Sequence, residues 1–297
     1  MHTFKGGIYA ILSSGTFGLI PLFSLPLLQS GLHPTSILFY RLGFAALMMG
    51  LIVLLTRRSF RVNLRDLMVL AGLGALYLST SLGLLLSYNY IPSGVTTTIN
   101  FLYPLVVAIA MSLFFKEKSS IWILVAVLIS LAGVGLLSWG DIGNNDPGKG
   151  VLFAAMTIFS YAIYIIMMMK SRVATMDSLV LTFYVLLFGA LCFLLASLVF
   201  VGSIDGLHGG EVWMNILLLA AIPTVFSNIT LVLAIKAIGS TMTSILGSME
   251  PLMAVLVGVL HFGETFNMES AAGLILVITS VIIVILQSKH KEELPTA

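Results

Sequence analysis

Charged residues are scarce in this chain. Only 9% of its 297 residues are Asp, Glu, Lys or Arg, whereas 59% are hydrophobic, and the mean hydropathy is +1.11. Water-soluble domains carry about 25% charged residues, so a water-exposed surface cannot be built from so few. The scarcity of charge excludes a soluble globular protein and indicates an integral membrane protein.

Cysteine is nearly absent, and so are the common catalytic motifs. The single cysteine, Cys192, lies in an apolar run, which excludes a disulfide framework and a metal–thiolate site. The sequence contains no H-E-x-x-H motif, no nucleophile elbow and no P-loop. Its basic residues do not cluster on a face that could fold by itself. We therefore expect no enzymatic activity, no cofactor, no metal site and no nucleic-acid partner.

Long apolar runs, in contrast, fill the chain. A helix needs about 20 apolar residues to cross the hydrocarbon core of a bilayer, and ten such helices with short loops account for most of this sequence. We predict an all-α integral membrane protein. Its predicted helices are 7–28, 36–55, 67–87, 94–115, 119–138, 150–169, 178–200, 212–235, 241–260 and 268–287.

The basic residues predict the orientation of these helices. Ten crossings place both termini on one side, and twelve of the fourteen Lys and Arg residues then fall on that side. Only Lys149 falls in an opposite loop, and Arg41 lies within a predicted helix. Because cytoplasmic loops carry an excess of Lys and Arg, we predict a multi-pass protein of the cell (plasma or inner) membrane with both termini in the cytoplasm.

The sequence also repeats itself. A shift of 147 residues aligns Pro104 with Pro251, and each proline precedes a glutamate, Glu117 or Glu264, by thirteen residues. A slightly different shift aligns the beginnings of the two halves, including Phe39-Tyr40 with Phe183-Tyr184. Because proline, glutamate and helix boundaries agree together, we interpret the two stretches as copies of one unit.

Each copy contains five predicted helices, so the second copy must insert upside down. The loop charges follow this inversion: the basic loop 57–66 corresponds to 201–211, which has no Lys or Arg. We predict two inverted five-helix repeats, 7–138 and 150–287. Inverted repeats are typical of alternating-access transporters, whose substrate site lies between the repeats near the middle of the membrane.

These features resemble the drug/metabolite transporter superfamily, and in particular its EamA-type branch. The resemblance rests on the two five-helix units, the Pro–Glu spacing, Glu250-Pro251 in the second copy and an arginine, Arg41, in the second helix. It implies a ten-helix bundle with a central cavity and with the fifth and tenth helices at the periphery. It further implies export of amino acids or related metabolites, although other members carry sugars, nucleotide derivatives or drugs. The first copy has Tyr103 where the second has Glu250.

Two prolines lie about midway along predicted helices. Pro104 and Pro251 lack an N–H group and would free the carbonyl groups of Asn100 and Gly247, four residues back. A free carbonyl at membrane depth needs a partner, which a wet cavity supplies. The alternative is a kink that serves packing alone.

Two charged residues fall within predicted helices. Glu250 is the only acidic residue that lies deep in one, and such residues are costly in free energy and usually functional. It could bind the amino group of a zwitterionic solute, exchange a proton, or pair with a polar group of another helix. Arg41 lies near the outer end of its helix, where it could extend to the interface, pair with Glu264 or bind substrate.

Further polar side chains complete the predicted cavity. Tyr77 and Thr224 correspond under the 147-residue shift, as do Ser81 and Asn228, so the two pairs lie at matching depths. Serine and threonine can also bond to their own helix. The full set of candidates is Glu250, Asn100, Tyr103, Tyr77, Ser81, Thr224, Asn228, Tyr161 and Arg41, with Pro104 and Pro251 as kinks.

Few charges and several aromatic rings would line such a cavity. This favours neutral, zwitterionic or partly apolar solutes. We predict a secondary transporter, an exporter of small metabolites such as amino acids, in a lipid bilayer and as a monomer or homo-oligomer. A channel-like facilitator or a lipid flippase could use the same cavity.

Overall fold

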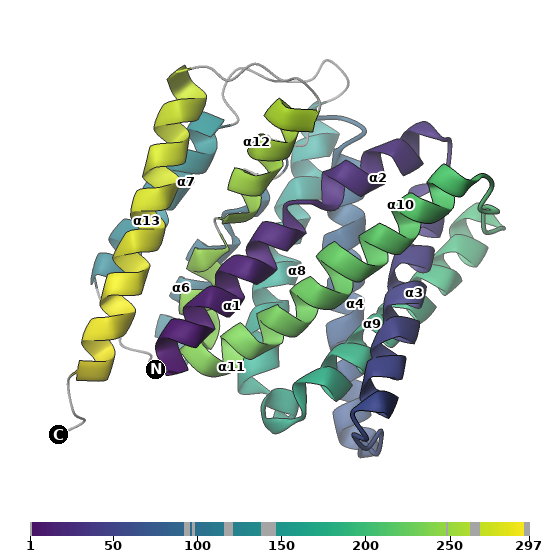
Figure 1. Cartoon of the computed structure of the whole chain (residues 1–297), viewed down its shortest axis with the longest axis horizontal. Helices are drawn as coiled ribbons and strands as arrows, with labels where there is room; N and C mark the ends of the chain where they lie inside the picture. Colours follow the sequence, from purple (N-terminus) through teal and green to yellow (C-terminus); the bar gives the residue numbers. More distant parts are fainter. Residues whose placement is uncertain are drawn as a thin grey trace.

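The fold is a bundle of helices (Figure 1). It is a computed structural model that describes residues 2–91, 96, 99–115, 121–137, 147–247, 249–261 and 268–293, and no strand occurs in these ranges. Within these described ranges, six helices are long and apolar enough to cross a membrane, and two shorter apolar helices accompany them. The all-helical prediction is therefore confirmed, whereas the number of ten crossings stays a prediction.

The described residues of the first half form six helices. They are α1 (His2–Phe17), α2 (Ile20–Gln29), α3 (Pro34–Leu55), α4 (Leu64–Ser87), α6 (Tyr103–Phe115) and α7 (Ile121–Leu137).

The second half adds three short segments to its helices. It contains α8 (Pro147–Lys170), a 3-10 turn η1 (Arg172–Thr175), α9 (Ser178–Ala196), a π segment η2 (Ser197–Val201), α10 (Gly210–Ala220), a π segment η3 (Ala221–Phe226), α11 (Ser227–Leu246), α12 (Met249–His261) and α13 (Met268–Glu293).

Local sequence explains where two of the long helices begin. Before α3, the side chain of His33 accepts the Thr35 N–H, and Pro34 occupies the first turn, where a missing N–H costs nothing. Before α9, the Asp177 carboxylate accepts the N–H groups of Leu179 and Val180. Both caps satisfy backbone donors that would otherwise lack partners.

The most extensive helix contacts join the two halves of the chain. They pair α1 with α11, α4 with α8, α3 with α9, and α7 with α13. Exchanging the two predicted repeats turns the first pair into the second and leaves the other two unchanged. Figure 1 shows α7 and α13 together at one edge of the bundle, which is where the resemblance places the fifth and tenth helices.

Glycine permits the closest of these contacts. A Cβ atom at Gly83 of α4 would lie 2.6 Å from Thr157 Cγ2 and 3.0 Å from the Phe153 carbonyl oxygen of α8. A Cβ atom at Gly74 would lie 3.0 Å from the backbone nitrogen of Gly189 in α9. Small residues of this kind let membrane helices approach backbone to backbone.

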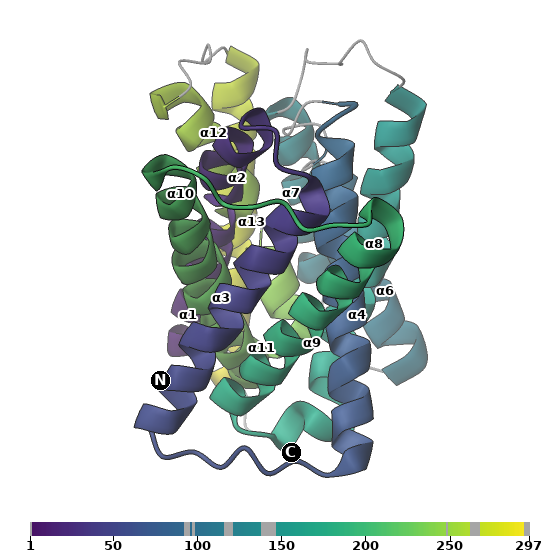
Figure 2. The ribbon, with the colours of Figure 1, turned by 90° about the vertical axis from the view of Figure 1, so that its right-hand side faces the viewer.

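Two tyrosines make matching contacts at the two ends of the α3–α9 pair. The Tyr40 hydroxyl of α3 donates to the Asp205 carbonyl at 2.8 Å, and the Tyr184 hydroxyl of α9 donates to the Phe60 carbonyl at 2.7 Å. Each tyrosine thus bonds to the loop that follows its counterpart helix. Figure 2 shows the loop between α3 and α4 at the end of the bundle where the chain begins, and the loop between α9 and α10 toward the other end.

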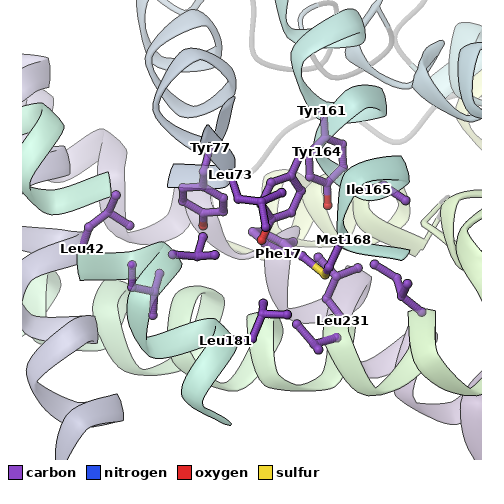
Figure 3. Close-up of a cluster of buried hydrophobic side chains, with 14 of the residues drawn as sticks. Phe17, Leu42, Leu73, Tyr77, Tyr161, Tyr164, Ile165, Met168, Leu181 and Leu231 are labelled. Carbon is purple, nitrogen blue, oxygen red and sulfur yellow. The ribbon is translucent and has the colours of Figure 1, made fainter. Parts of the chain in front are cut away.

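The interior is packed with apolar and aromatic side chains. One large buried cluster includes Phe17, Leu73, Tyr77, Tyr164 and Met168, contributed by α1, α4 and α8 (Figure 3). The outer surface is equally apolar, since Phe114, Phe200 and Leu260 are 79%, 84% and 82% exposed. Large apolar side chains on the outside as well as the inside are what a lipid environment requires.

The structure corrects three of the predicted helices, each of which is interrupted. The predicted helix 7–28 is interrupted at Gly18-Leu19, between α1 and α2. The predicted helix 94–115 is interrupted at Phe101-Leu102, before α6, and the predicted helix 241–260 between α11 and α12. The predicted gap between 235 and 241 is confirmed: Gly239, inside α11, has φ 82° and ψ 169°, so two helical segments meet there. Glycine adopts a positive φ without the steric cost that other residues meet.

Candidate functional site

One cavity is lined by several of the buried polar residues. Its volume is about 40 Å³ for the centres of water-sized molecules, enough for only about three waters at roughly 10–15 Å³ each. Contributions come from α1, α2, α3, α4, α8, α10 and α12. Its lining residues are Phe17, Ile20, Ser24, Ile37, Leu38, Arg41, Tyr77, Thr80, Ser81, Leu84, Leu85, Tyr88, Asn100, Tyr161, Leu219 and Glu250.

Arg41 is held in this cavity from one side. Its side chain is 3% exposed, which excludes extension to the membrane interface, and Glu264 lies outside the described residues. Arg41 Nε donates a hydrogen bond of 2.7 Å to Thr224 Oγ1. Arg41 Nη2 is buried and has no hydrogen-bond partner among the described residues. A buried cation with an unused donor is costly unless an acceptor can reach it.

A π segment presents Thr224 to Arg41. Pro223 in η3 has no N–H to offer the Leu219 carbonyl four residues back, and the Thr224 hydroxyl donates to that carbonyl instead, at 2.7 Å. The same hydroxyl oxygen accepts from Arg41 Nε. π segments are rare and often lie at functional sites. The sequence signal for this one was Pro223 within an apolar run, which the sequence analysis missed.

Asn228 lies one helical turn beyond Thr224. Its Nδ2 donates to the Thr224 carbonyl at 2.8 Å and to the Tyr77 hydroxyl at 3.3 Å. Its Oδ1 is buried without a hydrogen-bond partner among the described residues. Ser24 Oγ of α2 is also buried without a hydrogen-bond partner among the described residues, and Ser24 lines the cavity. The site therefore contains unused donors and acceptors on two sides.

Glu250 enters the cavity from the first turn of α12. The helix is interrupted before this residue, and the Glu250 N–H donates to the Gly247 carbonyl at 2.9 Å. The prediction that Pro251 lies midway along a helix and frees this carbonyl is therefore wrong: Pro251 is the third residue of α12. Proline is well suited to a first turn, since its missing N–H has no partner there in any helix.

Pro104 follows the same pattern in the first half. It is the second residue of α6, not a mid-helix kink. The chain turns just before it, where the Leu102 N–H bonds to the Ile99 carbonyl at 3.1 Å. Both prolines thus lie in the first turn of a short helix that follows an interruption of the helical backbone. The midplane sites of transporters with inverted repeats are typically built from such discontinuous helices.

Tyrosine rings line the cavity or pack against its lining. Ring centroids lie 4.6 Å apart for Tyr103 and Tyr161, 6.0 Å for Tyr161 and Tyr164, and 5.8 Å for Tyr77 and Tyr164. The Tyr103 hydroxyl donates to the Ser244 carbonyl at 3.2 Å, which joins α6 to α11. Figure 3 shows Tyr77, Tyr161 and Tyr164 grouped above Met168 and Leu231.

The structure gathers most of the candidates. Arg41, Tyr77, Ser81, Asn100, Tyr161 and Glu250 line the cavity. Thr224 and Asn228 support that lining through their bonds to Arg41 and Tyr77. Tyr103 contacts the ring of Tyr161 but is not among the lining residues. Asn100 accepts from the Thr157 hydroxyl at 2.7 Å.

Phe17, Ser24 and Leu219 also line the cavity, and the sequence analysis did not select them. Pro21 and Pro26, on either side of Ser24, could have indicated a broken first helix and hence a functional role for this segment.

Multiple apolar helices around a small polar interior define a multi-pass membrane protein. The model of the EamA-like transporter family matches residues 4–139 and again residues 148–286. Together these matches cover nearly the whole chain, and the chain belongs to this family.

Curated relatives are similar over most of their length. The chain is 28% identical to the uncharacterized transporter YojE of Bacillus subtilis over 91% of this chain and 90% of that protein. It is 25% identical to the uncharacterized inner membrane transporter YicL of Salmonella typhimurium, over 78% and 76% respectively. A solved crystal structure with 19% identity has a TM-score of 0.77 over 98% of this chain and 99% of that one, a likeness of fold alone.

Proposed function

We propose that this transporter is a secondary carrier that exports small neutral, zwitterionic or partly apolar metabolites, such as amino acids, by alternating access. It acts without enzymatic chemistry, in the plasma or inner membrane. Both termini and the 57–66 loop face the cytoplasm in this proposal, on the charge bias of the loops. The export direction rests on the family resemblance.

The observation that carries the proposal is the pair of broken helices beside one cavity. α6 and α12 each begin with a proline in the first turn, after a break, and at positions related by the 147-residue shift. The helix contacts also persist when the halves are exchanged, and so do the contacts of Tyr40 and Tyr184. An inverted relation between the halves accounts for all three.

The size of the cavity supports alternating access over a channel. A volume of about 40 Å³ holds a few waters and no amino acid, so passage requires the helices to move. The buried apolar cluster that contains Met168 shares Phe17, Tyr77 and Tyr161 with the cavity lining and fills the adjoining interior. Opening toward one side and then the other is the motion that an inverted pair of repeats provides.

Counterflow in liposomes tests the proposal. Purified protein is reconstituted into vesicles loaded with an unlabelled amino acid at high concentration, and uptake of the same labelled amino acid is measured across a panel. A carrier shows saturable uptake that the internal pool stimulates. Uptake that neither saturates nor responds to the internal pool would indicate a channel. Flipping of fluorescent phospholipids, without counterflow of any solute, would indicate a flippase.

A further inference from the structure

The cavity is lined by one guanidinium group and one carboxyl group. Among its described lining residues only Arg41 has a basic side chain and only Glu250 a carboxyl group. They come from opposite halves of the chain, α3 and α12. No ion pair within 4.0 Å joins them in the described part of the chain, where the ion pairs are Arg58–Asp177 and Arg172–Asp66. A guanidinium and a carboxyl group thus face one cavity without a direct contact between them.

The cationic side has a fixed position and a free donor. Arg41 Nε is anchored on Thr224, and Thr224 on the Leu219 carbonyl, each at 2.7 Å. This chain of bonds uses one edge of the guanidinium and leaves Nη2 buried without a partner among the described residues. Guanidinium groups bind carboxylates through such free N–H groups with charge-assisted hydrogen bonds. The arrangement therefore provides a binding position for one carboxylate.

The rest of the lining limits what else the solute can carry. With a single arginine and no lysine among the lining residues, a phosphate ester or dicarboxylate would leave a negative charge unmatched in a poorly solvated site. Ile20, Ile37, Leu38, Leu84 and Leu219 form apolar walls, which favour an aliphatic group. Among the described lining residues, Glu250 provides the one carboxyl group that could face an ammonium group.

We propose that the cavity recognises an aliphatic α-amino acid by its two ends, with Arg41 binding the carboxylate and Glu250 binding the ammonium group. The inference rests on the proposed function and adds to it a substrate class and an orientation. Thr224 is a positioning residue, because it touches the guanidinium and not the solute. The aliphatic side chain lies against the apolar walls, and the cavity widens to admit it.

Three probes of matched shape separate the two ends. L-leucine carries both charges, 3-methylbutylamine lacks the carboxylate, and 4-methylpentanoate lacks the amino group. Affinity is measured on the purified full-length protein from the concentration dependence of its unfolding temperature, because a ligand that binds only the folded state raises that temperature. For the wild type we expect leucine to bind at least tenfold more tightly than either analogue.

Substitutions then assign each end. Arg41→Gln should weaken leucine at least tenfold and leave 3-methylbutylamine unchanged, while Glu250→Gln should weaken leucine and leave 4-methylpentanoate unchanged. Thr224→Val, which keeps Arg41 and removes only its anchor, should weaken leucine severalfold and 3-methylbutylamine not at all. The matched controls Arg172→Gln and Glu269→Gln change exposed residues outside the cavity and should bind all three probes as the wild type does.

Several outcomes overturn the inference. Leucine that fails to bind, or analogues that bind as well as leucine, would exclude two-ended recognition. Arg41→Gln weakening leucine and 3-methylbutylamine equally would show a structural arginine, and Thr224→Val decides the matter if Arg41→Gln does not fold. Counterflow of some solute without the two-ended pattern would refute this site and keep the carrier. The two-ended pattern without any counterflow would keep the site and refute the carrier.

Discussion

The fourth helices of the two repeats have the same backbone plan and different chemistry. Both are interrupted, and both resume with a proline in the first turn. In the first, the residue before the proline is Tyr103, whose hydroxyl donates a hydrogen bond to the Ser244 carbonyl. In the second it is Glu250, which lines the cavity. At the position three residues before these, the first repeat has Asn100 and the second has Gly247.

The two repeats share a backbone feature and differ in the side chains beside it. Each has an interruption followed by proline. One repeat has a tyrosine ring before this proline and the other has a carboxyl group. The centroid of the Tyr103 ring lies 4.6 Å from that of Tyr161, which lines the cavity, so Tyr103 supports the lining from behind. At the second break, Glu250 itself lines the cavity.

The strongest test of this comparison asks whether the halves are inverted at all. Ser59 lies in the loop 57–66 and Ser203 in its counterpart 201–211, and both are exposed. In a Cys192→Ala background, single cysteines at these positions should react with a membrane-impermeant maleimide from opposite sides. We expect Ser203→Cys to be labelled in intact cells. Ser59→Cys should be labelled only after the membrane has been permeabilised. Labelling of both from one side would mean that the halves are parallel.

Charge at the second break should matter far more than polarity at the first. Glu250→Gln keeps the size of the side chain and removes its charge, and charged hydrogen bonds contribute about 1.5–3 kcal/mol. We expect counterflow to fall about 10- to 100-fold when the substrate concentration is well below its half-saturating value, where the rate follows affinity. Uptake driven by a pH gradient should fall equally, because the substrate contact itself is lost. Normal exchange with loss of gradient-driven uptake alone would assign Glu250 to proton coupling instead.

The two breaks also contact each other, at Gly247. A Cβ atom there would collide with the Tyr103 hydroxyl and lie 2.7 Å from the Ser244 carbonyl oxygen. Gly247→Ala should therefore destabilise the protein by about 1–3 kcal/mol, as overpacking does. Adding Tyr103→Phe should restore part of the loss, so the two effects should not be additive. Additive unfolding free energies would show that the two breaks are independent.

Tyr103→Phe alone should have the smallest effect. It removes one hydrogen bond to the Ser244 carbonyl and keeps the ring contact with Tyr161. A neutral hydrogen bond contributes about 1 kcal/mol, so the unfolding temperature should fall slightly and counterflow should stay within about threefold of the wild type. A loss as large as that of Glu250→Gln would remove the distinction between a structural first break and a functional second one.

Proline positions and helix ranges were readable from the sequence, but the local geometry around them was not. The shift of 147 residues located both breaks, yet proline is compatible with a mid-helix kink and with a first turn. Whether the chain opens at Gly247 depends on Tyr103 of the other repeat, a contact between residues far apart in the chain. The site residues were recognisable as polar positions in apolar helices, which is a signal of composition.

The direction in which the side chains of these helices point could not be predicted from the sequence. A helix that is apolar on all sides has no polar stripe to indicate which face turns inward, so Arg41 could equally have extended to the interface. What fixes it is Thr224, in a π segment whose geometry a helical pattern does not reveal. Phe17 and Leu219 were missed for the same reason, because an apolar residue that lines a cavity looks like one that faces lipid.

The π segment also constrains how this chain can vary. Successive residues of an α-helix are rotated by about 100°, and η3 holds one residue more per turn than an α-helix would. Deleting a single residue from 221–226 would restore a regular helix and turn everything before it by that angle relative to Thr224, at almost no change in helix length. The bond between Arg41 and Thr224 therefore depends on the number of residues in 221–226, and a single deletion there should separate the two side chains although neither is changed.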